Sequence, residues 1–343
     1  EIRINGTTIV DYPQYKHRGL LIDTGRHYLA LSTIYKLVDA LAMNKMNVLH
    51  WHLMDDQSFP YQSERFPALS EKGAYFPTMV YTRADIRSVV AFARDRGIRV
   101  VPEIDVPGHT RSWGEAFPHL LTECYQSGEV VGLGPLDPTR NTTYALLEQL
   151  FQEVHEWFPD EFLHVGGDEV QTACWSSNPH IREYLKKKNI TVNYLQRDFM
   201  RSTLPLLPKQ TRPIVWQEAF DMNAIFEPKT HVQVLKAGHY VIFSSSWYLD
   251  YHNMPWEEFY RADPRQMVYN MRKKKSAGLE DIVGGEACMW GELADDSNIL
   301  SKRIEEHACR MNRRGIPAQP PNGPGFCIGA PPPLQKTYEV HNV

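Results

Sequence analysis

The sequence predicts a (β/α)8 barrel, and three features indicate this fold class. Short apolar runs alternate along the chain with segments of helical periodicity. The runs are apolar throughout rather than at every second residue, as in parallel strands that are buried on both faces. Their number, eight, is that of the strands in such a barrel. The runs lie at residues 19–23, 47–53, 98–105, 162–169, 213–218, 231–235, 240–247 and 282–290.

Apolar stripes with a spacing of three and four residues predict helices between the runs. Thr82 is the expected N-cap of one helix, with Asp85 three residues on and Gly97 as its stop. Asn178 and Pro179 open another helix as N-cap and first-turn proline. The stripes run from Ile34 to Leu41, Ile86 to Ala93, Leu147 to Phe158 and Leu300 to Met311.

The sixth and seventh runs conflict with a regular barrel. Only residues 236–239 separate them. Neighbouring parallel strands are ordinarily joined by a crossover of about a dozen residues or more. Either the two runs are not both barrel strands, or one crossover helix is missing from this chain.

The 343 residues suit one large domain or two ordinary ones, and a hydrophobic content of 42% is ample for a core. We expect a lead-in segment at 1–17, the barrel at 18–318 and an irregular tail rich in Pro and Gly at 319–343. The chain begins at Glu1 without a Met or an apolar leader, so we expect any signal peptide to have been removed or left out.

Charge and hydropathy argue against two classes of partner. The net charge is -4 and the basic run 272–275 is short, so no nucleic-acid partner is expected. No apolar stretch reaches the roughly 18 residues that a membrane-spanning helix needs. The triplets at Asn5, Asn141 and Asn189 are acceptors for N-glycosylation and favour a secretory or lysosomal route. Five cysteines leave at least one thiol unpaired within the chain.

Acids and aromatic residues follow the predicted strands at their carboxyl ends. In a barrel these ends meet around one mouth, where active sites lie. Buried charges are unfavourable unless they are paired, so such a ring is not typical of a core. It suits a sugar pocket, although any single acid can also be a solvated loop residue. The residues are Asp23, Asp55, Asp56, Glu103, Asp105, His109, Asp168, Glu169, Trp216, Glu218, Trp247, Tyr248, Asp250, Glu286, Trp290 and Glu292.

His50 and His52 present a metal-binding alternative. Histidines two residues apart share one face of a strand and could bind zinc. His109, His164 and Asp105 are the candidates for further ligands. Polar histidines that are hydrogen-bonded beneath the pocket are the alternative that we favour.

Seven motifs run in order through most of residues 12–327. They are HRGLLIDTGRHYL (17–29), NKMNVLHWHLMDDQSFPYQS (44–63), RGIRVVPEIDVPGHTRSW (96–113), FLHVGGDEVQTACW (162–175), IVWQEAF (214–220), SSWYLD (245–250) and GGEACMWGE (284–292). By these motifs the chain resembles the catalytic domain of the β-N-acetylhexosaminidases, family 20 of the glycoside hydrolases, and especially the animal lysosomal and secreted enzymes.

The resemblance implies a retaining, substrate-assisted glycosidase without metal or cofactor. The acetamido oxygen of the substrate would attack its own anomeric carbon. Glu169 would be the general acid and then the base. Asp168 would orient the acetamido N–H and stabilise the cyclic cation. Two adjacent acids would therefore have different tasks and need different pKa values.

The resemblance also implies the roles of other residues. Arg26 would bind the C3 and C4 hydroxyls, and Tyr248 the acetamido carbonyl. A supporting network would lie behind the acid, and further groups would line the pocket or bind the C4 and C6 hydroxyls. The network residues are Asp55, Asp105 and His109, and the further groups are Trp216, Trp290, Asp250 and Glu292. The implied disulfides are Cys124–Cys174 and Cys309–Cys327, which leave Cys288 free.

This sequence departs from the family pattern in three places. We expect the small α/β domain ahead of the barrel to be absent from this chain. The third pocket tryptophan and the sixth crossover helix are missing between 232 and 239, and the segment after Glu292 is shortened. Alternative splicing or an incomplete gene model would explain such losses.

The expected function is removal of terminal non-reducing β-GlcNAc or β-GalNAc from glycoconjugates. The alternatives are a catalytically weak or inactive carbohydrate-binding variant of that enzyme and, behind it, a metal-dependent barrel hydrolase. The expected partners are GlcNAc- or GalNAc-terminated glycans and a second subunit in a homo- or heterodimer. The expected location is lysosomal or secreted.

Overall fold

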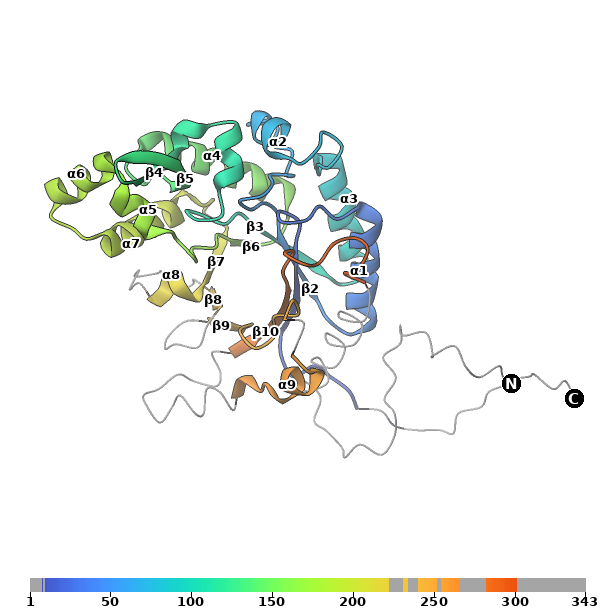
Figure 1. The fold of residues 1–343 in the computed structure, drawn as a ribbon. Helices are drawn as coiled ribbons and strands as arrows, with labels where there is room; N and C mark the ends of the chain where they lie inside the picture. Colours follow the sequence, from blue (N-terminus) through green and yellow to red (C-terminus); the bar gives the residue numbers. More distant parts are fainter. Residues whose placement is uncertain are drawn as a thin grey trace, which may run out of the picture.

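The computed structural model describes residue 8 and residues 10–221, 231–233, 240–251, 254–265 and 282–300. Eight parallel strands form a closed barrel in the order β1-β10-β9-β8-β7-β6-β3-β2 (Figure 1). All eight predicted runs therefore contain barrel strands, and the predicted fold class is confirmed. The strands are β1 (His17–Asp23), β2 (Val48–His52), β3 (Arg99–Glu103), β6 (Phe162–His164), β7 (Arg212–Trp216), β8 (His231–Gln233), β9 (Tyr240–Phe243) and β10 (Ile282–Met289).

The barrel interior changes from apolar to polar along the strands. Five strands each contribute one aliphatic or aromatic side chain to a buried cluster. Because alternate residues of a strand share a face, the residues two positions further along also point inward. The apolar cluster consists of Val48, Val101, Phe162, Ile214 and Ile242. The next inward residues on four of these strands are His50, Glu103, His164 and Trp216, all buried.

Helices surround the barrel where amphipathic stripes were predicted. Thr82 and Asp85 form a reciprocal capping box at the start of α3. The Asn178 side chain accepts hydrogen bonds from the backbone N–H groups of His180 and Ile181 at the start of α6. The helices are α1 (Leu31–Met43), α2 (Ala68–Gly73), α3 (Arg83–Arg94), α4 (Asn141–Trp157), α5 (Thr172–Ser177), α6 (Pro179–Lys188), α7 (Val192–Thr203), α8 (Gln217–Asp221) and α9 (Trp256–Arg261), with 3-10 turns η1 (Arg111–Glu115), η2 (Pro118–Leu120) and η3 (Leu204–Leu206).

An antiparallel hairpin outside the barrel was not among the predicted elements. It consists of β4 (Leu121–Gln126) and β5 (Glu129–Leu136). Ser127 and Gly128 connect the two strands with φ values of 53° and 90°. Positive φ at both central residues is the requirement of a tight hairpin turn, so the Ser-Gly pair was the available signal. A disulfide between Cys124 and Cys174 joins this hairpin to α5.

Strands β8 and β9 resolve the conflict between the sixth and seventh runs. They pair in parallel, with His231 opposite Tyr240 and Val232 opposite Val241. The alternative in which one run lies outside the barrel is therefore wrong. Because β8 has only three residues, the chain needs to return by only about 10 Å to start β9. The six residues 234–239 lie outside the described part, and a link of six residues can span about 20 Å when extended, which is more than this return requires.

Several predictions fall on residues outside the described ranges. They concern the first residues of the lead-in segment with Asn5, the basic run 272–275, the helix after Leu300, and the tail 319–343 with Cys327 and the preceding Cys309. Asn141 and Asn189 are described and exposed, and Cys288 is buried and free.

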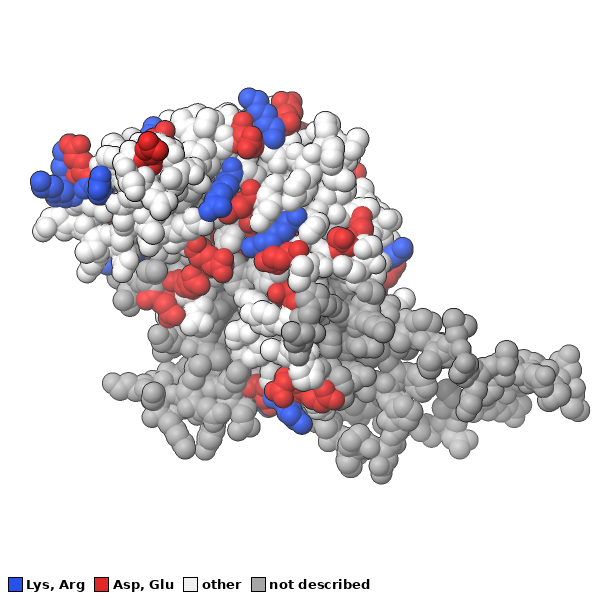
Figure 2. Space-filling model, viewed as in Figure 1, with Lys and Arg blue, Asp and Glu red and all other residues white. Residues whose placement is uncertain are grey.

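Charged residues of both signs share the part of the surface that the structure describes (Figure 2). Figure 2 shows Lys and Arg scattered among acidic residues on one face, with no continuous basic stripe in the coloured part. Among the described helices, none combines the length and the apolar character that crossing a membrane requires.

Candidate active site

A pocket of about 230 Å³ opens at the carboxyl ends of the barrel strands. Its lining combines carboxylates, aromatic rings and one guanidinium group. These side chains come from the last residue of β2 and from the segments that follow β1, β3, β6, β9 and β10. They are Arg26, His52, Asp105, His109, Asp168, Glu169, Tyr248, Asp250, Tyr251, Trp290 and Glu292.

The structure brings most of the sequence-predicted site residues to this pocket. Trp216 and Asp55 do not line it but lie directly behind it, both buried. Tyr251 lines the pocket and was not predicted. Its signal was its position three residues after Tyr248, whose ring lies 5.8 Å away.

Left-handed backbone geometry places Asp168 and Glu169 at the end of β6. Gly166 and Gly167 have φ values of 65° and 97°, and Glu169 itself has a φ of 47°. A Cβ at Gly166 would lie 1.6 Å from Asp105 Oδ1, so only glycine fits at this position. The strand therefore ends at His164, earlier than the predicted run 162–169, and the two acids enter different surroundings.

The surroundings of the two acids differ in solvent access. The Asp168 side chain is 18% exposed and that of Glu169 is 70% exposed. Asp168 Oδ1 is buried and has no hydrogen-bond partner among the described residues. This oxygen is therefore an acceptor without a donor at the pocket wall.

Asp105, His109 and Asp168 form one electrostatic unit, with their polar atoms within 4.8 Å of one another. Burial, reinforced by the charge of Asp168, raises the pKa of Asp105 well above its ordinary value. Burial also raises the pKa of Asp168, to about 6, although the charge of His109 opposes this. Burial lowers the pKa of His109, but nearby carboxylates, Asp105 foremost, outweigh it and raise that pKa to about 10. At neutral pH the unit thus holds a cationic His109 and an ionised Asp168, while burial favours the neutral form of Asp105.

His109 also connects the two pocket acids to a buried chain of charged groups. His109 Nε2 lies 3.7 Å from Glu169 Oε2, and its Nδ1 contacts Asp55 Oδ1 at 3.1 Å. His52 bridges Asp55 and Glu103 with distances of 2.8 Å and 2.6 Å from its two nitrogens. Burial opposes ionisation of Asp55, but hydrogen bonds from both histidines hold its pKa well below the ordinary range.

The same alternation of carboxylate and imidazole continues toward the amino ends of the strands. His50 Nε2 lies 3.0 Å from Glu103 Oε2, and its Nδ1 lies 2.6 Å from Glu286 Oε1. Glu286 Oε2 contacts His17 Nε2 at 3.0 Å. Burial lowers the pKa of His50, but the charges of Glu286 and Glu103 raise it to about 9. Cationic histidines thus compensate the buried carboxylates along the barrel axis.

Arg26 closes the opposite side of the pocket. Its Nη1 lies 2.8 Å from Asp23 Oδ2 and 3.2 Å from Asp55 Oδ2, and its Nε lies 3.3 Å from Glu292 Oε1. Burial would lower the pKa of Arg26, but the acid charges, Asp23 first, outweigh burial and raise it. A fixed guanidinium edge next to a carboxylate is suited to hold a pair of neighbouring hydroxyls.

Tyr248 and Trp290 form an aromatic floor of the pocket, and the buried Trp216 lies beneath it. Trp216 and Trp290 lie 5.6 Å apart between ring centres, and Tyr248 lies edge-on to Trp290 at 6.1 Å. The Trp216 indole donates to Glu103 Oε1 at 2.8 Å, which fixes its orientation. Such a floor suits the apolar face of a sugar or its acetamido methyl group.

The histidines beneath the pocket were also candidates for a metal site. His50, Glu103 and His164 have ligand atoms within 4.8 Å of one another. His52 Nδ1 and Nε2 are both engaged by carboxylates, and His50 is held as a cation. A metal ligand must be a neutral imidazole, so this donor set fits hydrogen-bonded ion pairs better than a metal.

Comparisons with known proteins point to one family. Residues 15–309 match the model of glycosyl hydrolase family 20, catalytic domain. A β-hexosaminidase subunit beta of Mus musculus is 42% identical over 92% of this chain and 67% of its own length. A subunit alpha of Rattus norvegicus is 39% identical over 94% of this chain and 69% of its own length.

Solved structures agree with the sequence relatives. The Flavobacterium johnsoniae chitobiase is 31% identical, with a TM-score of 0.76 over 90% of this chain and 49% of its own. An exo β-N-acetylglucosaminidase from Vibrio harveyi in complex with N-acetylglucosamine is 26% identical, with a TM-score of 0.77 over 91% of this chain and 56% of its own. The chain thus spans about two thirds of the curated relatives and about half of these solved chains.

Proposed function

Because the chain belongs to glycosyl hydrolase family 20, we propose that it is an exo-β-N-acetylhexosaminidase. It would hydrolyse terminal non-reducing β-GlcNAc and β-GalNAc from glycoconjugates with retention of configuration. The observation that carries this proposal is the buried, unpartnered Asp168 Oδ1 beside the exposed Glu169. Asp168 can accept a hydrogen bond from the substrate, while Glu169 can exchange a proton with water.

In the first step the acetamido oxygen of the substrate attacks the anomeric carbon, and Glu169 protonates the leaving oxygen. Asp168 Oδ1 accepts the acetamido N–H and its charge stabilises the cyclic cation. Tyr248 donates to the acetamido oxygen and directs it, over Trp290 and the Trp216 ring behind it. In the second step Glu169 takes a proton from water while the water oxygen attacks the anomeric carbon. The bond from that carbon to the acetamido oxygen breaks, which opens the cyclic cation and gives net retention.

The remaining pocket groups would hold the sugar. Arg26 and Glu292, joined by their ion pair, would bind the C3 and C4 hydroxyls. Asp250 would bind the C6 hydroxyl, and its charge would disfavour a 6-sulfate. Asp55 and Asp105 would position His109, whose charge lies 3.7 Å from the Glu169 carboxylate.

A second candidate is a catalytically weak or inactive carbohydrate-binding form. The observation that favours it is the six-residue link between β8 and β9, which lacks the third pocket tryptophan. Loss of one wall admits water and loosens the acetamido group, and a misplacement of 1 Å can cost about 100-fold in rate.

Release of the chromophore from an aryl β-GlcNAc by the purified chain tests the proposal. Turnover supports the glycosidase. No turnover together with tight binding of GlcNAc-thiazoline supports the binding form, and failure of both contradicts each candidate. Unchanged turnover in the presence of a chelator would exclude the metal-dependent alternative.

The cellular location and the partners of the chain are also proposed. The exposed Asn141 and Asn189 support glycosylation on a secretory or lysosomal route. The names of the relatives, subunits alpha and beta, support a homo- or heterodimer. Glycans ending in GlcNAc or GalNAc are the proposed partners.

A further inference from the structure

A second, smaller hollow lies next to the sugar pocket. It has a volume of about 60 Å³ and shares two lining residues with the pocket, His109 and Glu169. Arg111, Gln171 and Asp56 also line it. Glu169 is thus the partition between two open spaces.

This arrangement determines which part of a substrate meets the second hollow. A general acid must reach the oxygen of the bond that breaks, with the sugar on one side and the leaving group on the other. If the terminal sugar occupies the larger pocket, the leaving group extends past Glu169 over Arg111 and Gln171. We propose that these two side chains bind a neutral, hydroxyl-bearing sugar as the leaving group, an inference that rests on the proposed function.

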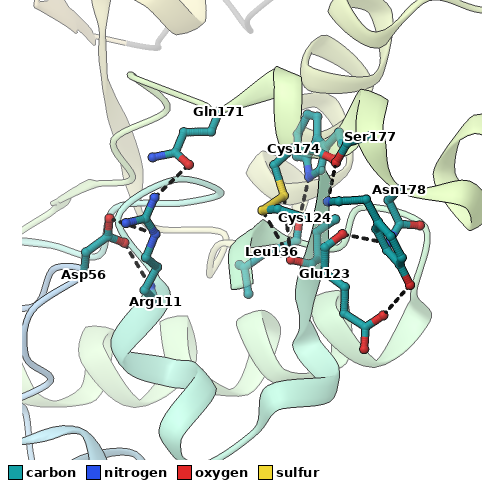
Figure 3. Close-up of a disulfide and its surroundings, with 12 residues drawn as sticks. Asp56, Arg111, Glu123, Cys124, Leu136, Gln171, Cys174, Ser177 and Asn178 are labelled. Atoms are coloured by element: carbon teal, nitrogen blue, oxygen red, sulfur yellow. Dashed lines mark hydrogen bonds and ion pairs between the residues drawn. A yellow bond between two sulfur atoms is a disulfide. The ribbon is translucent and has the colours of Figure 1, made fainter. Parts of the chain in front are cut away.

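Arg111 is held in place from two directions (Figure 3). Its backbone N–H donates to Asp56 Oδ1 at 2.9 Å, and its Nη2 donates to Gln171 Oε1 at 2.7 Å. In the described part of the chain, Arg111 Nη1 and Gln171 Nε2 have no partner. The side chain of Arg111 is 46% exposed, so a ligand can reach it. The pair therefore offers two preoriented N–H donors.

The charge balance favours a neutral ligand over an anion. Arg111 Nε lies 3.6 Å from Asp56 Oδ2, and this carboxylate offsets the guanidinium charge. The carboxyl group of Glu169 lines the same hollow. Hydroxyl groups can accept from the free N–H donors without repulsion by these acids.

The disulfide supports both sides of this hollow. Gly134 lines it, and a Cβ there would lie 2.5 Å from Cys174 Sγ and 2.7 Å from Cys124 Sγ. Gln171 is the N-cap residue of α5, which carries Cys174. The cross-link thus fixes β5 and the start of α5 on either side of the space.

Two substrates with the same terminal sugar test the proposal. N,N′-diacetylchitobiose has a second sugar as leaving group, whereas an aryl β-GlcNAc has a ring without hydroxyls. We expect Arg111→Ala to lower kcat/KM for the disaccharide about 10-fold and to leave the aryl substrate within about twofold. Arg94→Ala is the control, since Arg94 is exposed and pairs only with its neighbour Asp95 among the described residues. An equal effect of Arg111→Ala on both substrates, or on neither, would overturn the proposal.

A binding experiment distinguishes failure of this proposal from failure of the proposed enzymatic activity. In a Glu169→Gln background, Arg111→Ala should weaken binding of chitobiose about 10-fold while GlcNAc-thiazoline, which fills only the sugar pocket, binds as before. This readout needs no turnover. Unchanged affinity for chitobiose contradicts the leaving-group site, whether or not the chain is an active enzyme.

Discussion

At the scale of single residues, the site depends on carboxyl groups whose pKa values are raised by burial. Burial raises the pKa of Asp105 well above that of an ordinary carboxyl, and it raises the pKa of Asp168 to about 6. Asp105 Oδ1 accepts from the Gly167 N–H at 3.0 Å. Burial therefore favours the neutral form of Asp105, and in that form its hydroxyl can donate a hydrogen bond toward Asp168.

The Asp105→Asn variant should retain most of the catalytic activity. Its amide oxygen can accept from Gly167 and its N–H can donate toward Asp168, as a neutral acid does. We expect kcat/KM of Asp105→Asn within about 10-fold of the wild type, and a loss of about 100-fold or more for Asp105→Ala, whose cavity frees Asp168. Steady-state kinetics on an aryl β-GlcNAc measure both. An Asn variant as impaired as the Ala variant would show that Asp105 must ionise.

Glu169→Gln should separate substrates by their leaving groups. Without the acid, cleavage of a poor leaving group should fall by about 100- to 10,000-fold. A dinitrophenyl leaving group needs no proton, so its first step should be much less affected. The ratio of rates on the two substrates is the measurement, with the unfolding temperature as a control for the fold. A uniform loss on both substrates would remove Glu169 from the acid role.

At the scale of elements, the end of β6 depends on glycine. Gly166 has a φ of 65°, and a Cβ there would meet Asp105 Oδ1. The left-handed backbone at Gly166 turns the chain so that Asp168 lines the pocket. Gly97, after α3, has a φ of 73° but nothing within 4 Å of its missing Cβ.

Gly166→Ala and Gly97→Ala form a matched pair. Gly97→Ala should lower stability by about 1–2 kcal/mol through its backbone alone and leave kcat/KM unchanged. Gly166→Ala adds the collision with Asp105 and should also reduce kcat/KM by about 100-fold. Thermal unfolding and steady-state kinetics of both variants check this. Equal effects of the two changes on kcat/KM would mean that the approach of Asp105 to Gly166 does not matter for the site.

At the scale of the whole molecule, buried ion pairs make stability depend on pH. The pKa of His50 is raised from 6.5 to about 9 and that of His109 to about 10. A raised histidine pKa stabilises the fold fully below pH 6.5, and the stabilisation is lost as pH rises through the folded-state value. Burial would raise the pKa of Glu286, but the charge of His50 and hydrogen bonds from His17 and His50 lower it, so its contribution is present above pH 4.5 and is lost as pH falls below that value.

The unfolding temperature should therefore be higher near pH 6 than near pH 10. Differential scanning calorimetry in buffers of equal ionic strength measures the change. The alkaline fall should be smaller in His50→Gln, which removes one of the three raised histidine pKa values, those of His50, His52 and His109. An unfolding temperature that stays constant from pH 6 to pH 10 would contradict cationic histidines in the barrel.

The sequence by itself determined the barrel, four of the nine described helices (α1, α3, α4 and α6) and most of the residues at the pocket. Hydrophobic periodicity and the polar residues at strand ends are local properties of the sequence, so they can be recognised before the fold is known. Thr82 and Asn178 mark helix starts for the same reason, because a cap involves only neighbouring residues. The Ser127-Gly128 turn was equally local and could have been predicted.

Only the tertiary structure decided what depends on distances between strands. Strand register sets which histidine nitrogen faces Glu103 and which faces Glu286, and periodicity gives only the face of each strand. The pairing of β8 with β9 likewise follows from closure of the whole sheet. The hollow beside Glu169 needs Arg111 and Gln171 from separate segments, which meet only once the barrel and the disulfide hold them together.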